Sequence, residues 1–167
     1  MQIHKLKLPL SAPDISALKA GDKVYLSGEI FTARDQAHKR IVKAIEESRP
    51  LLLDLRETAI FYCGPSPAAP GKVCGAIGPT TSSRMDGLTL PLLEQGLKVM
   101  IGKGERSEEV ARAIKEYGAV YLTAIGGVSA VLARSIVSCE TFLWPDLGAE
   151  AVYRMVVKDL PCYVAIV

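Results

Sequence analysis

The sequence predicts a three-layer α/β domain with two sheets, of which the central sheet is parallel and covered by helices. The second half of the chain alternates between strand-like and helix-like stretches, a pattern typical of such a sheet. Strand-like stretches in the first half and at the C-terminus follow one another without this alternation, and a second sheet accommodates them. A length of 167 residues and an apolar content of 49% suit a single domain with a substantial core, residues 1–167.

The first half of the chain predicts short strands around one clear helix. Between residues 35 and 47, apolar side chains recur at helical spacing, and Pro50 closes this helix. A shorter helix is predicted over residues 14–18. Alternating or continuous apolar residues predict four strands, at residues 3–10, 24–30, 51–55 and 59–63.

Residues 64–78 interrupt the regular pattern, because prolines and glycines forbid a long helix and fix several turns. A weakly helical stretch then ends near Gly96. The clearest helix of the chain follows at residues 107–117, where Ser107 can cap the first turn and Gly118 suits the exit. A tight turn at 126–127 and a small-residue helix at 128–137 come next. Four strands are predicted in this half, at residues 98–101, 120–125, 152–157 and 163–167.

Composition excludes several classes of protein. Lys and Arg number 20 against 18 Asp and Glu, and a net charge of +2 argues against nucleic-acid binding. No apolar run reaches the ~20 residues that cross a membrane, and the N-terminus lacks the apolar stretch of a signal peptide, so we expect a cytoplasmic protein. The cysteines are few and scattered, without a CxxC pair, and are interpreted as small buried hydrophobic residues: Cys63, Cys74, Cys139 and Cys162.

Three polar clusters follow predicted strands, and each carries one cation. Arg34 lies at a strand-to-helix junction, Arg84 lies in the segment 78–86, and Lys103 lies between two glycines. Ligands of α/β sheets bind at the carboxyl ends of strands, so the three clusters can converge on one pocket. Two guanidinium forks and one ammonium suit a small polyanion, above all one with carboxylates. A phosphate ligand stays open, although neither GxxxxGK[ST] nor GxGxxG occurs.

Each cluster also has a purely structural interpretation. Arg34 can be a surface arginine paired with a neighbouring acid, and Asp35 can cap the helix that it begins. His38 can be a packed histidine, and the run 80–83 can be a capping loop. The sequence shows no ligand cluster for a metal, no Ser-His-Asp set and no isolated carboxylate pair. We therefore expect half of an active site, completed by another chain.

Several segments together resemble the iron–sulfur (class I) fumarase family. The chain is similar to the separate β subunit, which is equivalent to the C-terminal domain of the single-chain enzymes. L-tartrate dehydratase β subunits share these motifs. The resemblance covers nearly the whole chain, and its segments are residues 33–38, Phe61-Tyr62-Cys63-Gly64-Pro65-Ser66-Pro67, Gly78-Pro79-Thr80-Thr81-Ser82 with Arg84-Met85-Asp86, Ile101-Gly102-Lys103-Gly104, Gly126-Gly127 and residues 146–152.

The resemblance implies a swivelling β/β/α domain that works with an α subunit. The three cysteines of that subunit hold a [4Fe–4S] cluster with one open iron, which acts as Lewis acid on the leaving hydroxyl. The cysteines of this chain do not correspond to those ligands, so we expect it to bind no metal by itself. The implied reaction is the reversible hydration of fumarate to L-malate. An α2β2 assembly or a homodimer of this chain is compatible with the resemblance.

The resemblance also assigns roles to single residues. Arg34, Arg84 and Lys103 fall on substrate-binding positions, and we place Thr81 with them. Thr80 falls on the threonine that is proposed to exchange the C3 proton, although a threonine hydroxyl is a poor base without neighbouring cations.

The remaining expected site residues, Asp35, His38 and Asp86, hold the arginines and the helix start. Ser83 departs from the family, where Gly is frequent. The alternatives are an L-tartrate dehydratase β subunit and a non-catalytic module that binds dicarboxylates or phosphate.

Overall fold

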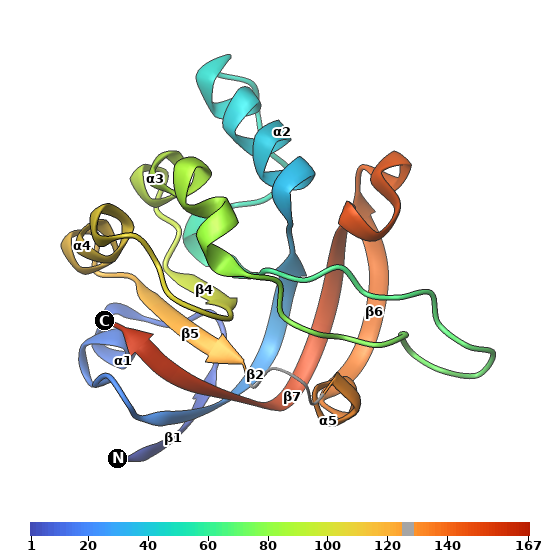
Figure 1. Cartoon of the computed structure of the whole chain (residues 1–167), viewed down its shortest axis with the longest axis horizontal. Helices are drawn as coiled ribbons and strands as arrows, with labels where there is room; N and C mark the ends of the chain where they lie inside the picture. The colour runs from blue at the N-terminus through green and yellow to red at the C-terminus, as the bar shows by residue number, and fades with distance from the viewer. Residues whose placement is uncertain (125–128) are drawn as a thin grey trace.

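The computed structural model describes residues 1–124 and 129–167 of the chain (Figure 1). It has a mixed α/β fold with one seven-stranded sheet, which confirms the predicted α/β class. Across the sheet, the strands lie in the order β1-β2-β3-β4-β5-β7-β6. Numbered along the chain, they are β1 (Ile3–Lys7), β2 (Lys23–Thr32), β3 (Ala59–Phe61), β4 (Val99–Gly102), β5 (Val120–Ala124), β6 (Ile136–Leu143) and β7 (Val152–Ile166).

Helices lie between the strands, and three of them cover the parallel part of the sheet. In Figure 1, α2, α3 and α4 lie side by side along one side of the molecule, and α5 lies near the opposite end beside β6 and β7. None of the described helices is long and apolar enough to span a membrane. The helices are α1 (Ala12–Ser16), α2 (Asp35–Glu46), α3 (Asp86–Glu94), α4 (Glu108–Glu116) and α5 (Ser129–Arg134), with 3₁₀ turns η1 (Leu55–Glu57), η2 (Ser82–Met85) and η3 (Pro145–Glu150).

The centre of the sheet is parallel, as the alternation of strands and helices predicts. β2, β3, β4 and β5 pair in parallel in that order. The long strand β7 then pairs antiparallel with both β5 and β2, so that these five strands form a closed ring of pairings. All strands are joined in one sheet, and the swivelling three-layer arrangement with a second sheet stays a prediction.

The strands β3, β4 and β5 are buried on both faces, since their alternate side chains enter two different hydrophobic clusters. Phe61, Ile101 and Leu122 pack with side chains of β2 and β7. Their neighbours in sequence, including Met100 and Tyr121, pack against the helices α2, α3 and α4. Such double burial explains why these segments appear in the sequence as continuous apolar runs.

The structure differs from the sequence prediction in three places. Residues 51–55 form a loop and the start of η1, because the Asp54 carboxylate accepts a hydrogen bond from the Arg56 amide and closes a tight turn at 3.1 Å. The predicted helix 128–137 ends at Arg134, and the unpredicted strand β6 begins two residues later. The two predicted C-terminal strands are one continuous strand, β7, which contains Pro161. The predicted turn at 126–127 lies outside the described residues.

Candidate active site

The first predicted site residue, Arg34, joins the carboxyl end of β2 to α2. Its side chain passes so close to Gly64 that a Cβ there would lie 2.9 Å from the Nη1 atom. The same Cβ would lie 2.7 Å from the carbonyl oxygen of Ala149, so only glycine fits. Within the described part of the chain, the buried Nε of Arg34 has no hydrogen-bond partner. A buried donor without a partner indicates a group that is completed by something else.

The second arginine, Arg84, reaches across to the start of α2. Its Nη2 atom lies 3.3 Å from Oδ1 of Asp35, in an ion pair that lacks the alignment of a hydrogen bond. The Arg84 side chain is 48% exposed, so it also faces solvent. The pair brings the loop before α3 to the carboxyl end of β2. Asp35 therefore contacts Arg84, and its role in the site stays a prediction.

The loop with both threonines lies across the carboxyl ends of β3 and β4. The Thr80 amide donates to the Tyr62 carbonyl at 2.6 Å, and Thr81 forms a parallel bridge with Lys103. Thr80 is partly exposed, whereas Thr81 and Lys103 are exposed. A Cβ at Gly102 would lie 2.0 Å from the Ser82 hydroxyl, so this glycine permits the close approach of the loop.

His38 contacts the backbone of Arg34 at the start of α2. Its Nδ1 lies 2.9 Å from the Arg34 carbonyl oxygen, and its ring stands edge-on to Tyr62 with the centroids 5.4 Å apart. The ring is completely buried, and burial lowers the pKa of His38 to about 4. His38 is thus neutral at pH 7, and Nδ1 donates its proton to the carbonyl. This geometry agrees with a residue that holds the helix start.

Asp86 holds an arginine that the sequence analysis missed. Its Oδ1 accepts from Nε of Arg106 at 2.6 Å, and its Oδ2 accepts from the Ser107 amide at 2.7 Å. The Arg106 side chain is completely buried, with its guanidinium carbon 5.2 Å from the Tyr62 ring centroid and 4.9 Å from that of Tyr121. The only signal in the sequence is an arginine directly before a helix cap, which is typical of any polar loop.

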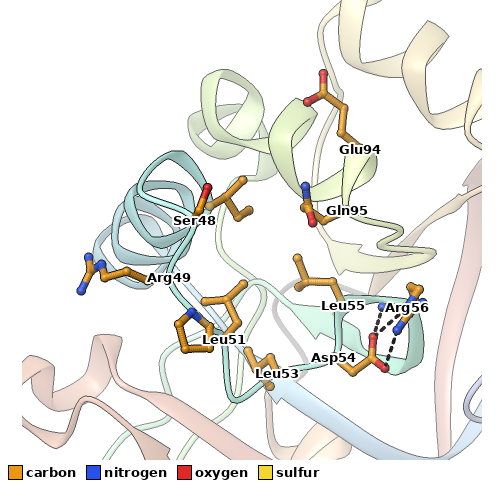
Figure 2. A pocket seen from close by; sticks show the side chains of 11 residues that line it. Ser48, Arg49, Leu51, Leu53, Asp54, Leu55, Arg56, Glu94 and Gln95 are labelled. Atoms are coloured by element: carbon orange, nitrogen blue, oxygen red, sulfur yellow. Dashed lines mark hydrogen bonds and ion pairs between the residues drawn. The ribbon is translucent and has the colours of Figure 1, made fainter.

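The structure thus gathers the predicted residues at one edge of the sheet, where β2, β3 and β4 end. A separate cavity of about 660 Å³, shown in Figure 2, lies at the other end of α2 and α3. Ser48, Leu51, Asp54 and Gln95 are among its lining residues. It contains none of the predicted site residues, so this cavity and the gathered cations lie in different places.

The described residues do not fit an iron–sulfur cluster. Among residues 1–124 and 129–167, no three His, Cys, Asp or Glu side chains are grouped to hold a metal ion. Burial raises the pKa of Cys162 to about 12 and that of Cys139 to about 11, and it also raises the pKa of Cys63. An iron–sulfur cluster is held by several cysteine thiolates together, and the described cysteines form no such group.

Comparisons with known proteins connect this chain to a family. Over 165 residues, 96% of this chain, the sequence is 35% identical to fumarate hydratase 2 of Leishmania major. It is 36% identical over 154 residues, 91% of the chain, to the aerobic class I fumarate hydratase of Escherichia coli. The chain spans only 29% and 28% of the length of these two enzymes.

A second group of relatives has a length close to that of this chain. The putative L(+)-tartrate dehydratase subunit beta of Methanocaldococcus jannaschii is 37% identical over 155 residues, which are 90% of this chain and 80% of that subunit. The family model described as Fumarase C-terminus matches residues 2–167, almost the whole sequence. The chain therefore belongs to the Fumarase C-terminus family.

Proposed function

We propose that this chain is the β subunit of a hydro-lyase that interconverts fumarate and L-malate. The observation that carries the proposal is the convergence of Arg34, Arg84 and Lys103 with two threonines where β2, β3 and β4 end. A four-carbon dicarboxylate has two anionic ends, and each planar guanidinium can bind one carboxylate through two parallel hydrogen bonds.

In this proposal, the cations bind and orient the substrate. Asp35 lies against one side of Arg84 at 3.3 Å and restricts the direction of its fork. Lys103 adds a mobile positive charge from the adjacent strand end. His38 holds the backbone of Arg34 through a 2.9 Å contact, so the first guanidinium also starts from a fixed point. Fixed partners lower the entropic cost of orienting the dicarboxylate.

Thr80 is the proposed site of proton exchange at C3 of the substrate. The Thr80 amide is held at 2.6 Å by the Tyr62 carbonyl, which fixes the position of its side chain relative to β3. The hydroxyl is a poor base by itself, and the neighbouring cations would stabilise its deprotonated form. Thr81 completes the substrate contacts from the exposed side of the loop.

The [4Fe–4S] cluster of the proposed enzyme belongs to an α subunit. The described residues of this chain offer no ligand group for it. The β-subunit relatives of similar length support a two-chain enzyme. The swivelling three-layer arrangement is part of the same proposal, and the burial of both faces of β3, β4 and β5 supports it.

The test is co-expression with a cluster-bearing α subunit and anaerobic purification. The complex should hydrate fumarate and dehydrate malate, while this chain alone should be colourless and inactive. Turnover and iron–sulfur absorbance in the separately reconstituted chain would contradict the assignment of the cluster to the partner. Binding of dicarboxylates or phosphate to a complex without any turnover would indicate a non-catalytic module.

L-tartrate is the second candidate substrate. Two tartrate dehydratase β subunits match this chain over 80% and 77% of their own lengths, which the single-chain fumarases do not. Malate and tartrate differ by one hydroxyl, and one hydrogen bond in the site can decide between them. Comparing kcat/KM of the complex on malate and on L-tartrate separates the two.

A further inference from the structure

Arg106 lies beneath the loops that carry the proposed substrate-binding residues. We infer that Arg106 is a positioning residue: its buried guanidinium fixes the segment 80–86 and the segment 103–104 relative to each other. The inference rests on the proposed function, because it says how that site is held in shape. Arg106 itself does not face the substrate, since its side chain is completely buried.

Each nitrogen of the guanidinium has a hydrogen-bond partner. Its Nε donates to Asp86 at 2.6 Å, Nη1 donates to the Tyr62 hydroxyl at 3.2 Å, and Nη2 donates to the Thr89 hydroxyl at 2.9 Å. The guanidinium carbon also lies over the rings of Tyr62 and Tyr121. A buried charge with such a partner set holds one geometry, because any displacement leaves a donor unsatisfied.

The partners of Arg106 connect directly to the loops. The Tyr121 hydroxyl lies 2.8 Å from both the Ser82 hydroxyl and the Gly104 carbonyl oxygen. The carbonyl can only accept, so the phenol donates to Gly104 and is free to accept from Ser82. Ser82 in turn accepts from the Lys103 amide at 3.1 Å. Stacking on Tyr121 thus links Arg106 to the backbone of Lys103.

A second connection leads to the threonine loop. The Tyr62 ring lies against Arg106, while the Tyr62 carbonyl accepts the Thr80 amide. Asp86, which binds Arg106, follows Arg84 by two residues in the sequence. Thr80, Arg84 and Lys103 therefore all lie within two or three connections of the same guanidinium.

Lysine cannot replace this arginine in the same role. An ammonium can still bind Asp86, but it is compact and cannot extend planar donors to Tyr62 and Thr89 together. Arg106→Lys thus keeps the charge and removes the fork. A displacement of about 1 Å in a catalytic group can cost ~100-fold in rate, so we expect kcat/KM to fall by roughly 10- to 100-fold.

The experiment is a double-mutant cycle in the α/β complex with fumarate as substrate. Arg106→Lys, Lys103→Met and the double variant are compared with the parent. If Arg106 acts through Lys103, the loss caused by Arg106→Lys should shrink by ~5-fold or more in the Lys103→Met background. Equal losses in both backgrounds would overturn the inference.

Two further variants distinguish a positioning role from a loss of activity through destabilisation of the fold. Tyr121→Phe removes only the hydroxyl that reaches Ser82 and Gly104, and it should show the same non-additivity with Lys103→Met, with a single loss of ~3- to 10-fold. Leu18→Ala destabilises the other hydrophobic cluster and should leave kcat/KM unchanged. An equal loss of kcat/KM in Leu18→Ala would overturn the inference. An inactive parent complex would overturn the proposed function as well, whereas an active parent with additive variants would overturn the inference alone.

Discussion

The two ends of the parallel strands β3 and β4 differ in how their cations are used. At the amino end, the cavity of Figure 2 carries Arg49 and Arg56, and each forms an ion pair with an acid close by in sequence. The Arg49–Glu47 distance is 2.6 Å and the Arg56–Asp54 distance is 3.2 Å. At the carboxyl end, the Arg34 Nε has no partner in the described structure.

Tight backbone packing is common to both ends and does not distinguish them. At the carboxyl end, a Cβ at Gly64 or Gly102 would meet another atom at 2.7 Å or less, and at the amino end a Cβ at Gly96 would lie 2.5 Å from Cγ of Arg56. The charges of the cavity at the amino end are satisfied locally, whereas the carboxyl end carries an arginine nitrogen without a partner among the described residues. The difference teaches that an incompletely paired cation identifies the candidate site better than the presence of a hollow.

The sharpest test of this comparison removes one threonine hydroxyl at each end. Thr80→Val at the carboxyl end should lower kcat of the complex by ~100-fold or more while KM changes little, because valine keeps the shape and removes the proposed proton-exchange group. Thr58→Val at the amino end should leave kcat unchanged. It removes a hydrogen bond of 2.7 Å to the Asp54 carbonyl and should cost about 1 kcal/mol of unfolding free energy.

Exchange of solvent deuterium into malate gives a direct readout for the same pair of variants. The parent complex and Thr58→Val should exchange the C3 hydrogen at similar rates. A Thr80→Val complex that exchanges at the parent rate would show that another group, on either subunit, transfers the proton.

The second test exchanges one arginine for lysine at each end. Arg84→Lys should lower kcat/KM by roughly 10- to 100-fold, since an ammonium cannot form two parallel hydrogen bonds to one carboxylate. Arg56→Lys should have no effect on kinetics, because the Arg56 side chain is 75% exposed and pairs locally. Kinetics and urea unfolding are measured for both. Parent kinetics in Arg84→Lys would mean that Arg84 serves only its ion pair with Asp35.

The sequence predicts the fold where local signals and packing agree. The helix from Glu108 to Glu116 has an apolar stripe and a Ser107 cap that accepts from the Val110 amide, as expected. The strand β6 is missed because its sequence carries no regular alternation and most of its residues are exposed or only partly buried, so that pairing with β7 selects the extended form. The run 51–55 is misread because an Asp54 turn outweighs its apolar residues.

The candidate site is predictable as a set of strand ends but not as a network. Arg34, Arg84 and Lys103 could be proposed together because the carboxyl ends of neighbouring parallel strands meet at one edge. The pairing of Asp86 with Arg106 could not, since Arg106 lies 20 residues away and its burial depends on two tyrosines from different strands. Nothing in the local sequence distinguishes such an arginine from a solvated one.

The third test concerns the buried histidine at the carboxyl end. Its folded pKa is about 4, below the ordinary value of 6.5. Between these two pH values, the imidazole of the unfolded chain binds a proton, whereas that of the folded chain does not. The contribution of His38 to the free energy of unfolding is therefore complete above pH 6.5 and falls as the pH decreases. By pH 5, His38 should account for a loss of about 2 kcal/mol.

Urea unfolding at pH 7 and pH 5 measures this loss in the parent and in His38→Phe, which keeps a ring against Tyr62. The difference between the two pH values should be smaller in the variant by about 2 kcal/mol, because all other titrating groups are shared. Equal pH dependence in both proteins would contradict the neutral, buried state of His38.

The smallest effect is expected at the amino end, from Arg49→Met. The Arg49 side chain is 56% exposed and its partner Glu47 is 47% exposed, so their ion pair is screened by solvent. Loss of such a pair changes the unfolding free energy by no more than about 0.5 kcal/mol, and methionine keeps an apolar stem at this position. Kinetic constants of the complex should equal those of the parent. A fall in turnover or in affinity for a dicarboxylate would mean that the cavity in Figure 2 takes part in the reaction. The contrast between the two ends of the sheet would then be wrong.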